Sequence, residues 1–243
     1  MIFVVSDIHG CYEEYRELLE LMNLRDGDAL YVLGDVVDRG RDGIKVLLDM
    51  MSRPNVIPIA GNHDYLASVI LEQLCVEITQ DNADNYLDAE FMKIYTMWIA
   101  DGGNPTLTSF KQLPRGQRAK VLDYLSDFLP YAQVEVNGRQ FILVHAGLMN
   151  FSKERDLKDY ALYERIFERT DYSKVYFSDR FLVTGHTPTS HINKSGSSRI
   201  YKENNHFAID CGAVYGGRLA ALCLDTLEEY YVRQALVIEG ESW

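Results

Sequence analysis

The chain has 243 residues and a hydrophobic fraction of 47%, enough to bury a sizeable core. Its 36 acidic and 24 basic residues give a formal net charge of −12 and an isoelectric point near 4.9, which argues against a protein that binds nucleic acid. No apolar run approaches the roughly 18 residues of a membrane span. The four cysteines form no zinc or redox motif, so we expect reduced thiols and a cytoplasmic location.

The first third of the chain alternates short β-branched runs with helical patterns. Strands and helices are predicted in turn at residues 2–5, 12–22, 30–33, 44–51, 56–60 and 65–74. This β-α-β-α-β-α order favours a largely parallel sheet.

The rest of the chain begins with residues 77–130, where two turn sequences break helical patterns, and we interpret this region as a small helical insertion. Beyond it, strands at 132–136 and 140–144 flank Asn137-Gly138, which is typical of a type I′ hairpin. Further strands are predicted at 181–184, 206–210, 219–224 and 229–233, with more antiparallel pairing than in the first third. We expect one α/β domain over residues 1–243, a sandwich of mixed β-sheets flanked by helices.

Five polar clusters follow apolar runs, and each contains or adjoins glycine. They are Ser6-Asp7-Ile8-His9-Gly10, Gly34-Asp35-Val36-Val37-Asp38-Arg39-Gly40, Gly61-Asn62-His63-Asp64, His145-Ala146-Gly147 and Gly185-His186-Thr187. Open α/β sheets bind ligands at the carboxyl ends of their strands, and glycine lets the backbone approach a bound ion. Alone, Asp7 could cap a helix and His145 could be a core histidine. Together, the carboxylate, imidazole and amide groups indicate a site for Mn²⁺, Fe or Zn²⁺ rather than Ca²⁺.

These motifs, read as SDIHG, GDVVDRG, GNHD, HAG and GHT, resemble those of the phosphoprotein phosphatase family of calcineurin-like metallophosphoesterases. The hairpin VNGRQFILVHAG and the segment IDCGAVYGGRL extend the resemblance, which covers residues 1–61 and 137–222. The length and the short insertion look most like the compact bacterial members, which include Ser/Thr protein phosphatases and symmetrical diadenosine tetraphosphatases.

The resemblance implies a calcineurin-like fold and two divalent metal ions, with Mn²⁺ as the expected metal and Fe or Zn²⁺ as alternatives. Asp7, His9 and Asp35 would bind one ion. The other would be bound by Asp35, Asn62, His145 and His186.

The resemblance also implies roles for residues that bind no metal. Asp38 would orient His63, and His63 would protonate the leaving alkoxide. Arg39 would bind the phosphate oxygens. The family's second phosphate-binding arginine matches Arg165, in a Tyr-x-Arg pattern where relatives usually have Trp-x-Arg, but a shift in register would favour Arg169. Both arginines could instead belong to the polar face of a helix.

Two further positions are less specific. Tyr215 is a candidate for a substrate-binding wall, although a packing role is the simpler reading. Asp64 stands where many relatives have Glu, and it could cap the helix that follows.

The leading hypothesis is a phosphomonoesterase that acts on phosphoserine or phosphothreonine, by attack of a hydroxide that bridges the two metals. The alternative is a symmetrical diadenosine tetraphosphatase or another nucleotide phosphohydrolase, so the partner is a phosphorylated protein or a nucleotide. A second alternative is a degenerate, non-catalytic scaffold, although none of the implied ligands is missing. The sequence predicts no oligomeric state.

Overall fold

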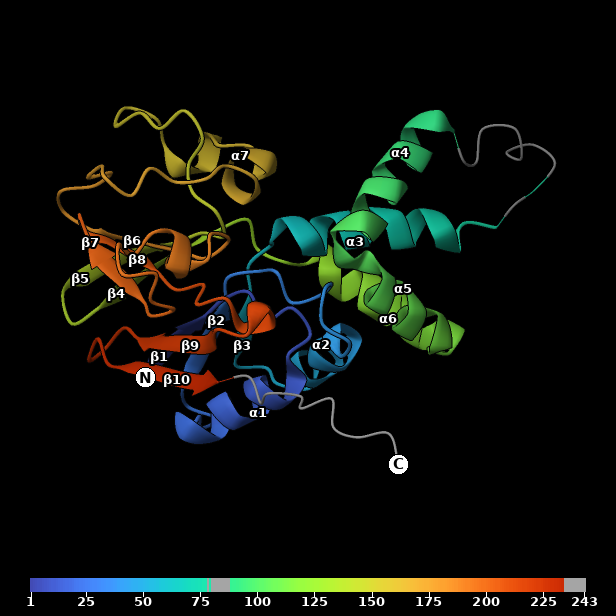
Figure 1. Ribbon diagram of the computed structural model, residues 1–243, viewed down its shortest axis with the longest axis horizontal. Coiled ribbons are helices and arrows are strands. Elements are labelled where there is room, and N and C mark those ends of the chain that lie inside the picture. Colours follow the sequence, from blue (N-terminus) through green and yellow to red (C-terminus); the bar gives the residue numbers. More distant parts are fainter. Residues whose placement is uncertain (78, 80–87, 234–243) are drawn as a thin grey trace.

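The computed structural model describes residues 1–77, 79 and 88–233, and its strands form two five-stranded sheets (Figure 1). The first sheet has the order β10-β9-β1-β2-β3. Its strands are β1 (Ile2–Val5), β2 (Ala29–Val32), β3 (Val56–Pro58), β9 (Arg218–Cys223) and β10 (Glu229–Arg233). The pairs β1-β2 and β2-β3 are parallel, as the sequence pattern predicts, and β9 and β10 extend the sheet in antiparallel fashion.

The second sheet has the order β4-β5-β6-β8-β7. Its strands are β4 (Ala132–Val136), β5 (Arg139–Leu143), β6 (Phe181–Thr184), β7 (Tyr201–Glu203) and β8 (His206–Ala208). The β4-β5 hairpin turns through Asn137 and Gly138, both with the positive φ of a type I′ turn. The later strands include more antiparallel pairs than the first third, as expected, in β4-β5, β7-β8 and β9-β10. β5, β6 and β8 pair in parallel, because crossover segments connect them.

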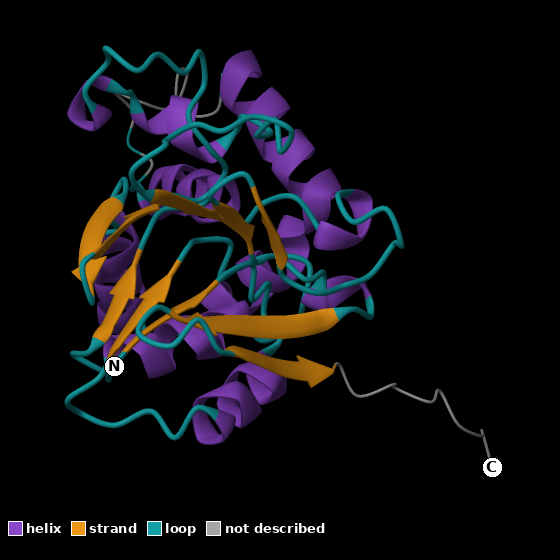
Figure 2. Cartoon of the chain, turned by 90° about the vertical axis from the view of Figure 1, so that its left-hand side faces the viewer, coloured by secondary structure: helices purple, strands orange, loops and turns teal. Residues whose placement is uncertain are grey.

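The sheets lie in two layers, and their facing residues form a core (Figure 2). Val4 packs into this core with Phe141, Val183 and other residues of the second sheet. Its neighbours Phe3 and Val5 point to the opposite face and pack with the helices. Because alternate side chains of a strand point to opposite faces, β1 is buried on both sides.

Seven α-helices occur in the described part of the chain. They are α1 (Tyr12–Leu21), α2 (Gly43–Met51), α3 (Asn62–Cys75), α4 (Ala89–Trp98), α5 (Asn104–Gln112), α6 (Arg115–Ser126) and α7 (Leu162–Ile166). The predicted insertion is helical over α4–α6, which pack against α2 and α3 (Figure 1). Residues 78 and 80–87 of the insertion lie outside the described residues.

All four cysteines are unpaired, and three of them, Cys11, Cys211 and Cys223, are buried. Among the described residues, no helix has the length and apolar character that a membrane crossing requires.

Candidate active site

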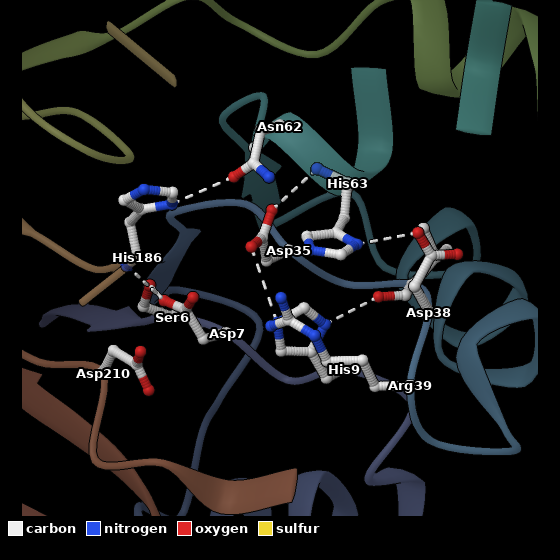
Figure 3. Close-up of polar contacts among 12 residues, drawn as sticks. Ser6, Asp7, His9, Asp35, Asp38, Arg39, Asn62, His63, His186 and Asp210 are labelled. Atoms are coloured by element: carbon white, nitrogen blue, oxygen red, sulfur yellow. Dashed lines mark hydrogen bonds and ion pairs between the residues drawn. The ribbon is translucent and has the colours of Figure 1, made fainter. Parts of the chain in front are cut away.

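The loops that follow β1, β2, β3, β5 and β6 converge on one region, which Figure 3 shows in close-up. They bring together the candidate residues Asp7, His9, Asp35, Asp38, Arg39, Asn62, His63, His145 and His186. Neighbouring parallel strands have their carboxyl ends at the same edge of a sheet. Because the two sheets pack together, these edges of the two sheets lie side by side. The five polar clusters of the sequence therefore meet in space.

The backbone of this region is unusual. Twelve non-glycine residues in the described chain have positive φ, and six of them are the candidate residues Asp7, His9, Asp35, Asp38, Arg39 and His186. This left-handed conformation costs energy for residues with a Cβ, and such strain gathers at functional sites. Glycine at position 61 leaves space for the Asp35 carboxylate, because a Cβ there would collide with it.

One group of potential metal ligands consists of Asp35, Asn62, His145 and His186. His145 Nε2 lies 3.0 Å from Asn62 Oδ1, 3.2 Å from His186 Nδ1 and 3.4 Å from Asp35 Oδ1. His145 Nδ1 lies 2.6 Å from the carbonyl oxygen of Leu33, which can only accept, so Nδ1 carries the proton and Nε2 a lone pair. Several electron-rich atoms therefore converge on one point, an arrangement that suits a divalent cation.

A second group consists of His9, Asp35 and His63. His9 Nδ1 lies 2.8 Å from the Val37 carbonyl oxygen, and Nε2 lies 3.5 Å from Asp35 Oδ2 and 2.5 Å from Arg39 Nη1. Burial lowers the pKa of His9 to about 3, so at neutral pH its imidazole is in the neutral form that binds metals.

Asp7 lies beside the first group. Its Oδ2 accepts hydrogen bonds from the Ser6 hydroxyl and, at 2.9 Å, from the backbone N–H of His186. Burial and repulsion from the Asp210 and Asp35 carboxylates raise the pKa of Asp7. A nearby cation would offset this repulsion, so the donor set fits divalent metal ions.

Asp210 follows β8 and is a site residue that the sequence reasoning missed. It is buried, lines the same cleft as Asp35, and accepts a hydrogen bond from the N–H of Gly212. The available signal was its place in IDCG, directly after an apolar run, as in the other five clusters.

Asp38 and His63 form a buried pair, with 2.8 Å between Asp38 Oδ2 and His63 Nδ1. Burial alone would lower the pKa of His63, but the Asp35 charge and the hydrogen bond to Asp38 outweigh it, and that pKa is raised. His63 is thus suited to hold a proton. Trp98 and Thr106 of the insertion also donate hydrogen bonds to Asp38, and no sequence motif predicts either contact.

Asp64 organises the loop after β2. Its Oδ2 accepts the N–H groups of Asp35 (2.7 Å) and Gly61 (3.2 Å), and its Oδ1 those of Val36 (2.9 Å) and Val37 (3.3 Å). Asp64 is the third residue of α3, which begins at Asn62 and not near residue 65, and it caps the helix by accepting the N–H of the N-cap residue Gly61. Burial and the neighbouring Asp35 charge raise the pKa of Asp64 to about 7.

A cleft of about 550 Å³ opens over Asp35, Asn62 and His186. Arg39 and Arg169 line it, and so does Tyr215, whose ring centre lies 5.4 Å from the Arg39 guanidinium carbon. His191, which matches no motif, lines it as well.

Arg165, the predicted second phosphate-binding arginine, is not among the residues that line this cleft. Its side chain is buried, stacks over the ring of Tyr131 at 4.7 Å and donates a hydrogen bond to the carbonyl oxygen of Leu157. Arg165 lies within the short helix α7, whereas Arg169 lies beyond its end at Ile166 and reaches the cleft. Of the two arginines, Arg169 is therefore the one that lines the cleft.

Asp101 belongs to the insertion and lines the cleft. Its carboxylate lies 3.3 Å from Arg39 Nη2 and 3.4 Å from His63 Nε2. A phosphate bound by Arg39 would compete with this carboxylate for the same guanidinium.

The chain belongs to the calcineurin-like phosphoesterase family, which matches residues 1–217, and it is a metal-dependent phosphoesterase. The predicted fold class is confirmed, and the family implies divalent metal ions without fixing their identity.

Among curated proteins, the chain is 27% identical to the asymmetrical bis(5′-nucleosyl)-tetraphosphatase PrpE of Geobacillus sp. strain WCH70, over 100% of this chain and 98% of that protein. It is 38% identical to the symmetrical bis(5′-nucleosyl)-tetraphosphatase of Nitrosospira multiformis, over 61% of this chain and 44% of that protein. A crystal structure of a protein provisionally described as a diadenosine tetraphosphatase superposes with a TM-score of 0.65 over 96% of this chain and 92% of that one. At 18% identity, that match supports the fold alone.

Proposed function

We propose that this protein hydrolyses the phosphoanhydride bridge of dinucleoside tetraphosphates. The observation that carries the proposal is the alignment of the whole chain with a tetraphosphatase. In this protein one cleft joins the Asp35 and His186 group to Arg39 and Arg169. The relatives support this nucleotide alternative better than the leading sequence hypothesis of phosphoserine or phosphothreonine hydrolysis.

The proposed metal ligands are the residues that the sequence motifs identify. Asp7, His9 and Asp35 would hold one divalent ion, and Asp35, Asn62, His145 and His186 the other, with Mn²⁺ as the proposed metal. When bound, such ions neutralise phosphate charge and make a nucleophile available from water at neutral pH.

The chain's own groups would do the remaining work. Arg39 and Arg169 would bind oxygens of the polyphosphate, for which a guanidinium offers paired hydrogen bonds. His63 would donate a proton from Nε2 to the leaving oxygen, while Asp38 holds Nδ1. Tyr215 is 63% exposed and would offer an aromatic face to a nucleobase.

The first experiment compares kcat/KM of the Mn²⁺-loaded protein on diadenosine tetraphosphate and on a phosphothreonine peptide, with a chelator control for each. We expect a preference of at least ~100-fold for the nucleotide, which corresponds to about 2.7 kcal/mol of transition-state stabilisation. The reverse preference would restore the protein phosphatase hypothesis. Absence of chelator-sensitive activity on both, together with no bound metal after loading, would support the scaffold.

The products identify the bond that is cleaved. Symmetrical hydrolysis of diadenosine tetraphosphate yields two ADP, and asymmetrical hydrolysis yields AMP and ATP, so ion-exchange chromatography separates the two reactions. Replacement His63→Asn tests the proton donor on phenyl phosphate, whose leaving oxygen is basic, because loss of a general acid lowers kcat by about 10²–10⁴-fold. Unchanged turnover with full metal content would exclude that role for His63.

A further inference from the structure

Asp38 is a fully buried carboxylate whose partners come from distant parts of the chain. Its Oδ2 accepts hydrogen bonds from His63 Nδ1 (2.8 Å) and Trp98 Nε1 (2.7 Å), and its Oδ1 accepts one from the Thr106 hydroxyl (2.7 Å). Trp98 ends α4 and Thr106 lies in α5. The insertion therefore supplies two of the three donors to this carboxylate.

The two insertion residues constrain Asp38 in different ways. The indole N–H of Trp98 can only donate, so Oδ2 has to accept. The Thr106 hydroxyl donates to Oδ1 and also accepts the backbone N–H of Asp38 at 2.9 Å. A planar carboxylate held at both oxygens cannot rotate without breaking a bond, so the imidazole of His63 that is bonded to it is held in one orientation.

The position of Trp98 is itself fixed by a kink between α4 and α5. Trp98 is buried, and its indole lies so close to Gly103 that a Cβ there would collide with the ring. Gly102 has φ +101°, and its carbonyl oxygen accepts the backbone N–H of Arg39 at 2.8 Å. The kink therefore anchors the insertion to the neighbouring residues Asp38 and Arg39.

We propose that Trp98 and Thr106 are positioning residues that act through Asp38 to hold His63 with Nε2 directed toward the cleft. His63 Nε2 forms no hydrogen bond within the described part of the chain, and it lies 3.4 Å from Asp101 Oδ2, on the cleft wall. This inference rests on the proposed function, since it takes His63 as the donor of the leaving-group proton.

A positioning role and a structural role differ in their dependence on the leaving group. A basic leaving oxygen needs a proton in the transition state, whereas a weakly basic one departs without much help. Misplacing His63 therefore slows hydrolysis of phenyl phosphate more than that of p-nitrophenyl phosphate. General destabilisation of the fold slows both reactions equally.

The test uses substitutions that remove single donors. Trp98→Phe removes the N–H and keeps an aromatic ring, and Thr106→Val removes the hydroxyl and keeps the shape. We expect each to lower kcat on phenyl phosphate by about tenfold and on p-nitrophenyl phosphate by less than about threefold, with KM within about twofold. Thr106→Ser keeps the hydroxyl and should restore most of kcat. Leu107→Val, a matched change in the buried part of α5, should leave the ratio of the two rates unchanged.

A second readout needs no substrate. The proton on His63 Nδ1 should give a downfield imidazole N–H resonance, assigned by its loss in His63→Asn. Trp98→Phe and Thr106→Val should shift or broaden this resonance, and Leu107→Val should not.

Equal losses on both aryl phosphates, or an unchanged resonance in Trp98→Phe, would overturn the inference. Failure of the proposed function is separate, because it would appear as wild-type protein without chelator-sensitive turnover of diadenosine tetraphosphate. If the wild-type protein does not hydrolyse the aryl phosphates either, the resonance alone decides whether Trp98 and Thr106 hold His63.

Discussion

Replacement of Asp64 by Asn should weaken both the fold and the metal site, because Asp64 binds four backbone N–H groups. Its two oxygens each accept a pair of them, from Asp35 and Gly61 at Oδ2 and from Val36 and Val37 at Oδ1. Asn is nearly isosteric, but its NH₂ group is a donor. Whichever way the amide turns, two N–H groups lose their acceptor.

The expected magnitude follows from these two lost acceptors. A buried donor without a partner costs about 1–3 kcal/mol, so the free energy of unfolding should fall by about 2–6 kcal/mol. The released loop carries Asp35, the residue shared by both proposed metal sites. Loss of a group that orients a metal ligand typically lowers metal affinity by about 10–100-fold, and we expect a decrease in that range for Mn²⁺.

The assay is urea unfolding followed by circular dichroism, with Mn²⁺ affinity measured by calorimetry. Both are done at pH 8, above the pKa of about 7, so that Asp64 is largely ionised. Asp179→Asn is the control, since Asp179 is exposed and paired with Arg180, and such surface pairs contribute about 1 kcal/mol or less. A loss below about 1 kcal/mol in Asp64→Asn with wild-type Mn²⁺ affinity would refute the reasoning.

Three further predictions concern the cleft and the core. Arg169→Ala should lower kcat/KM on dinucleoside tetraphosphate by about 10–100-fold, because hydrogen bonds to charged groups contribute about 1.5–3 kcal/mol. Arg165→Ala should act mainly on stability, which thermal unfolding measures. Asp101→Asn should lower KM by about two- to fivefold in steady-state assays, since its carboxylate lies 3.3 Å from Arg39 and competes with substrate phosphate. Burial lowers the pKa of His206 to about 3, so at acidic pH the unfolded chain binds a proton at His206 that the folded chain does not. The contribution of His206 to the free energy of unfolding is therefore fully present above the unfolded pKa of about 6.5. The free energy of unfolding, measured with urea, should fall by about 2 kcal/mol between pH 7 and pH 5 because of this residue.

Each of these predictions has a contrary outcome. A larger catalytic loss in Arg165→Ala than in Arg169→Ala would show that Arg165, not Arg169, is the second phosphate-binding arginine. An increase in KM on Asp101→Asn would mean that this side chain assists binding. If His206→Gln shows the same loss of stability between pH 7 and pH 5 as wild-type protein, His206 is not the source of the acid sensitivity.

Much of the fold could be predicted from local patterns. The alternation of β-branched runs and helical periods identified β1, β2 and β3 with their helices, because each element buries one face or both. The Asn137-Gly138 pair predicted the position of the β4-β5 hairpin, because few residue types adopt the positive φ angles of a type I′ turn. Pairing within the second sheet was not predictable in this way, because partners far apart in sequence leave no local signal.

The sequence by itself determined the candidate ligand set, because ligands sit in strand-end loops and each such loop carries its own glycine and polar residues. Only the tertiary structure decided which arginine reaches the cleft, since Arg165 packs over Tyr131 within α7 whereas Arg169, beyond the end of that helix, lines the cleft. It also decided that Trp98 and Thr106 bind Asp38 from 60 and 68 residues away along the chain. A hydrogen bond between distant residues depends on how helices pack, and that packing is a property of the whole core rather than of any motif.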